Sequence, residues 1–323
     1  MGERTHAVRL FEAIHRDARH WQIAALFGLF CLSLSTSDFS ARPLALMAAI
    51  VGAMSAQAVG TIWVNARREV RKAGSGSYWR GSSLEAGVVG WLAGFQWKSA
   101  LITSLSLSIL LRATSLWVWL AAGFIAISAK FLIRYRKKHL FNPACIGIVT
   151  VSVIGGSAAW VSPGQWGQTP LFAAFAIGFA ALVLSSAKRL DIALGFLIGF
   201  AAMLFGRALY LGDPMAIPMH QMQSGALLVF AFFMITDPRS TPDSRLARLI
   251  FAFAVAALAA WLSWEHHIRG AMLYALAGLA ILTPILDRVL PARRFEWTSK
   301  KETPDEPEAP RGGLRPRPHI VRA

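Results

Sequence analysis

The sequence is poor in charged residues and in cysteine. Only 15% of its 323 residues are charged, against about a quarter in ordinary soluble domains. Its two cysteines, Cys31 and Cys145, form no CxxC pair, which excludes a disulfide framework, a zinc site and a self-contained iron–sulfur cluster. The outward-facing histidines His220, His266 and His267 lie in loops or at the edges of apolar runs, which does not suit haem. The sequence also lacks a Walker loop, a dinucleotide fingerprint and a Ser-His-Asp order, and we predict no catalytic or metal-binding residue.

Hydrophobic residues make up 55% of the chain, and long apolar runs recur between clusters of charge. This pattern is typical of a polytopic helical membrane protein. The candidate spans are 22–37, 43–64, 97–111, 115–133, 141–160, 168–186, 191–210, 223–236, 247–264 and 270–287. The sequence therefore predicts an all-α polytopic membrane protein with about ten transmembrane helices.

The chain divides into three parts. Residues 1–21 are polar and basic and form the expected cytoplasmic N-terminus, followed by a first span that is not cleaved. Residues 22–290 form the expected transmembrane helical domain. Residues 291–323 are basic and rich in Pro, Arg and Glu, so we expect a disordered cytoplasmic tail.

The charges are distributed unevenly among the loops. Of the 33 Lys and Arg residues, only Arg42, Arg112, Arg207 and Arg269 fall on the expected outer side. Lys130 lies inside a span, where we expect its side chain to extend to the cytoplasmic interface. Such an asymmetry is what the positive-inside rule requires, and it predicts a bacterial inner-membrane protein with both termini in the cytoplasm. The net charge of +16 is thus a signal of topology, and nucleic acid is not an expected partner.

Two spans carry polar interruptions. Asn142-Pro143 interrupts the span 141–160, and the string MITDPRSTP at 234–242 closes another. Short or broken spans often line a cavity, because irregular backbone is tolerated only there. One such feature in each half of the chain favours two inverted five-helix repeats whose broken helices meet near the middle of the membrane.

Three polar residues inside or beside spans are candidates for a site. Asn142 could form a wall of a ligand or ion path, or only satisfy a break in the helix. Ser224 lies at the start of an apolar segment. This segment could be a half-helix whose N-terminus points at a phosphate or carboxylate, or an ordinary helix that packs closely against its neighbours. Asp237 comes before a proline, so its helix should end there, with a local pair to Arg239 as the plainer interpretation.

Several strings together resemble one known family. They are KFLIRYRKKHLFNPACIGI (130–148), GQTPL (167–171), SGALLVFAFFMITDPRSTP (224–242) and LDR (286–288). The chain resembles the NqrB/RnfD family over roughly residues 20 to 295, and its length is closer to RnfD. These proteins are membrane subunits of the Na⁺-translocating NADH:quinone oxidoreductase and of the Rnf electron transport complex. The resemblance implies flavin-mediated electron transfer coupled to Na⁺ or H⁺ translocation, with other membrane subunits as partners.

The resemblance also implies a cofactor. Family members carry FMN joined through its phosphate to the threonine of an S-G-A-T motif. Gly167 and Thr169 match this motif, whereas Trp166 stands in place of its Ser and Gln168 in place of its Ala. A flavin transferase would attach FMN to Thr169 in an outer loop. Non-covalent flavin or no flavin is left open, and the resemblance also allows riboflavin.

The expected surroundings of the flavin follow from the same comparison. Trp160 or Trp166 could stack on the ring, and Asn142, Ser224 and Asp237 would line a central cavity. Two other functions are left open by the residues themselves. Inverted halves with broken helices would also serve a transporter or channel without redox chemistry, and the polar breaks could simply seal helix packing in an assembly subunit.

Overall fold

A computed structural model describes residues 18–35, 42–73, 92, 94–135, 138–162 and 189–293. Within these ranges the protein is mainly helical, with two short two-stranded antiparallel sheets. Each predicted span coincides with a helix except 168–186, which lies outside the described residues, as do most of the N-terminal segment and all of the tail beyond residue 293. The predicted all-α class is confirmed.

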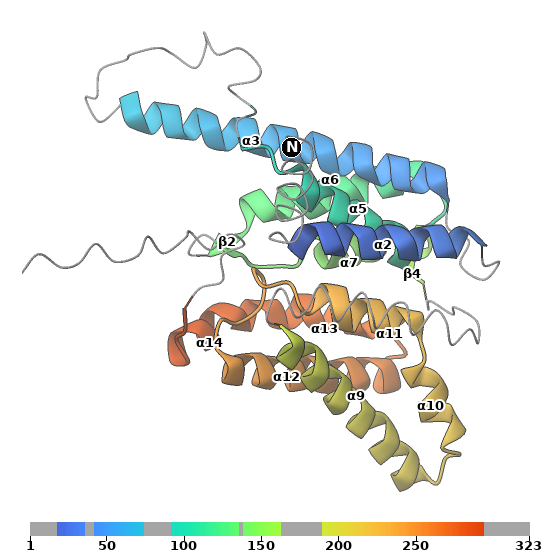
Figure 1. Cartoon of the computed structure of the whole chain (residues 1–323). Coiled ribbons are helices and arrows are strands. Elements are labelled where there is room, and N and C mark those ends of the chain that lie inside the picture. Colours follow the sequence, from blue (N-terminus) through green and yellow to red (C-terminus); the bar gives the residue numbers. More distant parts are fainter. Residues whose placement is uncertain are drawn as a thin grey trace, which may run out of the picture.

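The helices form two layers (Figure 1). The first layer contains α2 (Ala18–Ser35), α3 (Pro43–Ala73), α5 (Trp97–Leu110), α6 (Leu116–Leu132) and α7 (Pro143–Gly155), coloured blue to green. The second layer contains α9 (Leu190–Leu211), α10 (Ala216–Met222), α11 (Gly225–Val229), α12 (Arg245–Glu265), α13 (Ala271–Leu279) and α14 (Thr283–Val289), coloured yellow to red. The two halves of the chain thus occupy separate layers.

Four helical stretches are long and apolar enough to cross a membrane. They are Pro43–Arg68, Leu190–Leu211, Arg245–Glu265 and Ala271–Val289, the last joining α13 to α14 through the 3₁₀ turn η3 (Ala280–Leu282). Shorter apolar helices accompany them at Trp97–Leu110, Leu116–Leu132, Pro143–Ala158 and Gly225–Met234. A hydrocarbon core requires about 20 residues of helix, so length and composition identify a membrane protein.

Two antiparallel sheets of two strands each lie at opposite ends of the molecule (Figure 1). Strand β1 (Leu111–Ala113) pairs with β4 (Ala159–Val161), which follows the 3₁₀ turn η1 (Gly156–Ala158). Strand β2 (Arg134–Tyr135) pairs with β3 (Lys138–His139). We call these ends the β1–β4 end and the β2–β3 end. The four arginines expected on the outer side, Arg42, Arg112, Arg207 and Arg269, lie toward the β1–β4 end.

Small residues allow close packing within each layer. A Cβ atom at Gly52 of α3 would overlap the carbonyl oxygen of Leu120 in α6, so the two helix backbones touch there. In the second layer, Gly195 and Gly199 of α9 face Leu249 and Phe253 of α12. Within a membrane there is no hydrophobic driving force between helices. Small residues therefore stabilise helix contacts by letting the backbones approach closely and gain van der Waals packing.

The structure corrects the prediction of a broken helix at Asn142-Pro143. Helix α7 begins at Pro143, which occupies the first turn, and the Asn142 side chain caps it by accepting a hydrogen bond from the Cys145 amide at 3.0 Å. Proline suits this position because its missing N–H would have no partner in the first turn. The sequence therefore marks a helix start here, and the chain before it forms β3.

The second polar segment does end a helix, as predicted. Helix α11 continues directly into a π-helical turn, η2 (Phe230–Met234), and the helix ends before Asp237-Pro238. All five residues of η2 are buried. This segment lies in the interior of the protein, and one-turn π-helices of this kind frequently occur at functional sites.

Candidate functional site

A cavity of about 520 Å³ lies at the β1–β4 end. We call it the Trp160 cavity. Its walls include Leu110, Trp160, Ser162, Ser224, Phe230 and Arg269. The lining is mostly apolar, with two hydroxyl groups and one cation. Cavities of about 300–1,000 Å³ with this mixture of apolar walls and a few polar groups are typical of sites for small molecules and cofactors.

Strand β4 and the turn before α13 position the cavity walls. Trp160 stands opposite Arg112 in the β1–β4 sheet and is 40% exposed, while its neighbours Ala159 and Val161 are buried. Gly270 has φ +75°, and a Cβ there would lie 2.5 Å from Val161 Cγ2. Glycine is therefore required at this position, where the turn lies against β4 and brings Arg269 to the cavity.

Ser224 lies where the predicted half-helix begins. It occupies the N-cap position of α11, in extended backbone conformation, and it lines the Trp160 cavity together with Arg269. The predicted helix start at this residue is confirmed. Its contact with a phosphate or carboxylate group stays a prediction.

The other predicted flavin-binding residues, Trp166, Gly167 and Thr169, lie outside the described residues. Thr169 follows Ser162, a wall residue of the Trp160 cavity, by seven positions. A chain of seven residues spans at most about 25 Å when fully extended. The cavity therefore lies within reach of Thr169.

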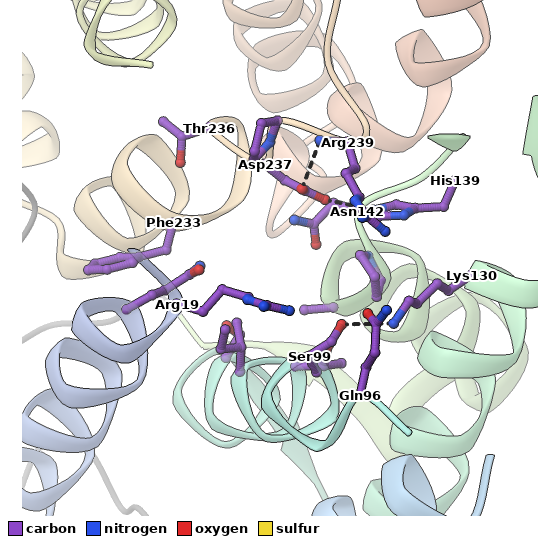
Figure 2. Close-up of a pocket in the computed structure, with 17 residues that line it drawn as sticks. Arg19, Gln96, Ser99, Lys130, His139, Asn142, Phe233, Thr236, Asp237 and Arg239 are labelled. Carbon is purple, nitrogen blue, oxygen red and sulfur yellow. Dashed lines mark hydrogen bonds and ion pairs between the residues drawn. The ribbon is translucent and has the colours of Figure 1, made fainter. Parts of the chain in front are cut away.

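A second cavity, of about 80 Å³, lies at the β2–β3 end. We call it the basic cavity. Figure 2 shows the polar side chains that surround it, among them Arg19, Ser99, Lys130, His139, Asn142, Asp237 and Arg239. They come from both layers of the molecule, and the space is large enough for several water molecules or a small ion.

Asp237 is the only carboxylate among the described residues that line this cavity. One of its oxygens lies 3.0 Å from His139 Nε2 and accepts a hydrogen bond from Ser240 Oγ at 3.1 Å, and the other accepts from the Arg239 amide at 3.1 Å. Burial raises the pKa of Asp237, but the charge of His139 and these hydrogen bonds outweigh burial, so the net pKa is below its usual value. Asp237 is therefore ionised at neutral pH, and its partner is His139 and not the side chain of Arg239.

Asn142 connects the two layers. While its carbonyl oxygen caps α7, its amide nitrogen donates a hydrogen bond to the carbonyl oxygen of Met234 at 3.2 Å. Met234 is the last residue of η2, where helix carbonyls lack partners. The side chain of Asn142 thus provides a hydrogen-bond partner for an amide at the start of α7 and for a carbonyl at the end of η2.

The structure overturns the expectation that Lys130 extends to the interface. Lys130 is only 4% exposed, and its ammonium donates hydrogen bonds to Gln57 Oε1 at 3.2 Å and Ser99 Oγ at 3.1 Å. Both partners are neutral. Helices α3 and α5 therefore hold this side chain inside the protein, beside the basic cavity.

A cluster of ion pairs beside the basic cavity was not predicted. Lys138 of β3 lies 2.8 Å from Asp243 and donates a hydrogen bond to Asp287 at 2.9 Å, and both distances join groups that are largely buried. Asp243 Oδ1 has no well-aligned hydrogen bond, so its contact with Lys138 is chiefly one of charge. These groups tie the β2–β3 hairpin to the second layer.

A second part of this cluster holds the start of α9. Arg248 of α12 binds both carboxylate oxygens of Asp191, at 3.1 and 2.9 Å from its Nε. Arg189 donates a hydrogen bond to the carbonyl oxygen of Pro242 at 2.9 Å. Burial, and then the charge of Arg248, lower the pKa of Arg189 to about 10, so this arginine stays charged at neutral pH.

The predicted site residues do not share one cavity. Asn142 and Asp237 line the basic cavity, whereas Ser224 lines the Trp160 cavity at the opposite end. The expectation of a common central cavity for these three residues is wrong, because η2 lies between them. Trp160, which the sequence offered as a stacking partner, does line a cavity of suitable character.

Comparison with known proteins finds similarity to one family over part of the chain. Residues 157–296 match the family described as NQR2, RnfD, RnfE. A protein of Alcanivorax borkumensis, named as one subunit of an ion-translocating oxidoreductase complex, is 28% identical over 222 residues, which cover 50% of this chain and 64% of that protein. A protein of the same name from Stutzerimonas stutzeri is 29% identical over 163 residues, covering 45% of each chain. Another from Citrobacter koseri is 36% identical over 89 residues, covering 28% of this chain and 25% of that protein.

The chain thus spans less than two thirds of the length of these relatives. The matched segment contains the GQTPL string, η2, Asp237 and Arg269. Most of the first layer, including Lys130 and Asn142, lies outside it.

Proposed function

We propose that this chain, a distant member of the NQR2, RnfD, RnfE family, is the flavin-carrying membrane subunit of an electron transport complex that translocates Na⁺ or H⁺. The observation that carries the proposal is the Trp160 cavity. Its lining is mostly apolar and includes an aromatic ring, Trp160, and a cation, Arg269. Ser162 also lines it, and Thr169 follows seven residues later in the sequence. Its partners would be the other membrane subunits of such a complex.

The residues of the Trp160 cavity fit an FMN group. Trp160 offers a flat, partly exposed ring against which an isoalloxazine ring could stack, and Phe230, Met272 and Leu273 exclude water around it. Arg269 places a positive charge beside the same space, where it would stabilise negative charge on the phosphate or on the ring. When bound, FMN supplies electron transfer in one- or two-electron steps.

We propose attachment of this FMN at Thr169, with Gly167 and Trp166 as the neighbouring residues of the attachment motif. A flavin transferase acting on the outer side would transfer the FMN group from a flavin dinucleotide to the Thr169 hydroxyl, breaking the pyrophosphate bond and releasing the nucleoside monophosphate. Support comes from the position of the β1–β4 end, which carries few cations and is therefore the expected outer side in a bacterial inner membrane. A further riboflavin could be bound in the complex without a covalent link.

The ion path would run between the two cavities. Phe230 lines the Trp160 cavity, and Phe233 of the same π-turn lines the basic cavity. Asp237, with its depressed pKa, places a fixed negative charge at the β2–β3 end of this route. Small adjustments of one π-helical turn could connect or separate the two ends.

We also propose that the two layers are inverted five-helix repeats. The packing within each layer supports this: α3 packs against α6 as α9 packs against α12, and α7 packs against α6 as α13 packs against α12. The basic cavity lies at the start of α5 and α7, and the Trp160 cavity at the start of the corresponding helices α11 and α13. An inversion would place such related sites at opposite ends, as here.

The attachment is tested by expressing the full chain together with a flavin transferase. After denaturing electrophoresis, the wild-type band should fluoresce and Thr169→Ala should not. Thr114→Ala, an exposed threonine at the same end, is the matched control and should fluoresce like the wild type. Fluorescence that survives in Thr169→Ala would contradict attachment at this residue.

A transporter or channel without redox chemistry is the second candidate. It is favoured by the two cavities that approach one π-turn from opposite ends, an arrangement that needs no cofactor. If the purified chain carries no flavin after co-expression, neither covalent nor released by denaturation, solute or ion uptake into proteoliposomes becomes the discriminating measurement. Uptake in that case would support the transporter and contradict the flavoprotein.

A further inference from the structure

Among the described residues that line the basic cavity, cationic side chains outnumber carboxylates. The side chains of Arg19, Lys130 and Arg239 enter this space from three separate segments (Figure 2). Among the described lining residues, Asp237 is the only carboxylate, and it is already bound by His139 at 3.0 Å and by Ser240 at 3.1 Å. This engaged carboxylate does not balance both Lys130 and Arg239.

Lys130 is the most confined of these cations. Its hydrogen bonds go to Gln57 and Ser99, and no carboxylate in the described part of the chain lies within ion-pair distance of its ammonium. A buried charge without an opposite charge is costly, because the energy of removing it from water is not recovered. Within the described part of the chain, the charge of Lys130 therefore has no carboxylate in direct contact to compensate it.

Arg239 and the start of helix α7 also contribute positive charge to the basic cavity. In the described ranges, the guanidinium of Arg239 has no ion pair, although it lies beside Asp237 and His139 (Figure 2). The first turn of α7 faces the cavity through Asn142, Pro143 and Ala144. The start of a helix carries a partial positive charge, so this helix also favours an anion in the cavity.

We propose that the basic cavity binds a phosphate-type oxyanion, either free phosphate or the phosphate of an anionic lipid headgroup. Lys130 would provide a point charge, and the planar guanidinium groups of Arg19 and Arg239 would donate paired hydrogen bonds to the oxygens. The proposal does not depend on the flavin, which would lie at the opposite end. A bound oxyanion would also reduce the repulsion that a cation meets on entering from the β2–β3 end.

The test is thermal unfolding of the full chain in neutral detergent, followed by the fluorescence of its tryptophans. Sodium phosphate should raise the Tm along a saturable curve, whereas sodium chloride at matched ionic strength should not. A ligand that binds only the folded state produces such a shift. The absence of a saturable shift with both phosphate and the anionic lipid described below would overturn the proposal.

Arg239→Gln is the main variant, because this residue is only partly buried in a loop and its loss leaves the core intact. We expect its phosphate affinity to fall about tenfold or more, as the loss of one charge-assisted pair predicts. Lys130→Met should lose the response completely, if the variant folds. Arg134→Gln is the matched control, since Arg134 is exposed at the same end and does not line the cavity.

The control distinguishes a site from a general charge effect. An equal loss of response in Arg134→Gln and Arg239→Gln would contradict the proposal, as would an unchanged response in Arg239→Gln. The source of the oxyanion is resolved in nanodiscs of phosphatidylcholine with or without phosphatidylglycerol. If the headgroup is the ligand, phosphatidylglycerol should raise the Tm of the wild type and abolish its response to phosphate, and Arg239→Gln should show neither effect.

Discussion

Phe230 and Phe233 lie three residues apart on one π-helical turn, yet they line different cavities. Phe230 faces the Trp160 cavity at one end of the molecule, and Phe233 faces the basic cavity at the other. Their side chains are 0% and 3% exposed, so both are packed inside the protein. This turn is therefore the barrier between two spaces that approach it from opposite ends.

Removing part of this barrier should open a leak. Phe233→Ala should increase passive Na⁺ or H⁺ flux through proteoliposomes, because the cavity at the β2–β3 end would then extend past η2. Loss of a buried phenylalanine also costs about 3–5 kcal/mol, so flux must be normalised to folded protein. Phe124→Ala is the control, since Phe124 is 40% exposed on α6, and its flux should equal that of the wild type. Equal flux in all three proteins would show that Phe233 is not part of a barrier.

The ion pair of Asp237 with His139 should make the stability of the folded protein depend on pH in the acidic range. The pKa of Asp237 is lowered in the folded state, so its stabilising contribution is fully present above the unfolded value of about 4 and is lost as the pH falls through the folded value. Asp237→Asn should therefore destabilise the protein by about 1–3 kcal/mol at pH 7. The difference in Tm between variant and wild type should narrow only below about pH 4.

A suitable control for this series is Asp213→Asn. Asp213 pairs with Arg207 at 3.8 Å, and both side chains are more than a third exposed, so its loss should have little effect at any pH. A constant difference between Asp237→Asn and the wild type from pH 7 to pH 3 would show that ionisation of this carboxyl does not contribute.

The buried pair of Lys138 should hold the two layers together. Lys138→Met leaves Asp243 and Asp287 without their cation, and breaking a buried pair costs about 3–5 kcal/mol. Denaturant unfolding in mixed micelles measures this change. Arg245→Gln, at an exposed position of the same end, should change stability by less than about 0.5 kcal/mol. Similar losses in both variants would mean that the cluster adds nothing beyond surface charge.

Close packing of α3 on α6 should make Gly52 intolerant of a single methyl group. Gly52→Ala places a Cβ against the carbonyl oxygen of Leu120, which must move, and we expect a loss of about 1–3 kcal/mol. Gly206→Ala in α9 is the matched change, because nothing lies within 4 Å of its Cβ position. It should be neutral or slightly stabilising, since alanine favours helix. The two variants are compared by their Tm.

The sequence predicts the helices well because apolar runs set their positions directly. It also predicts the helix start at Ser224 and the end before Asp237, where local chemistry decides the conformation. At Asn142-Pro143 the expectation of an interrupted helix is wrong, since proline after a capping residue can begin a helix as readily as interrupt one.

The polar contacts between segments could not be predicted in this way. Asp237 meets His139 from 98 positions away, and Lys138 meets Asp287 from 149 positions away. Lys130 lies near a helix end, where extension to water is the ordinary outcome, and only the position of Gln57 and Ser99 keeps it inside. Such contacts depend on how the layers pack, which no local pattern encodes.

The central claim is that a flavin lies against Trp160. The most direct measurement is the fluorescence lifetime of flavin bound to the native chain, co-expressed with a flavin transferase. In the wild type, stacking on Trp160 should shorten the lifetime, and Trp160→Leu should lengthen it. Trp117→Leu, at a tryptophan that is 76% exposed at the same end, should leave it unchanged. A chain that holds no flavin, or a lifetime that Trp160→Leu does not alter, would contradict the account.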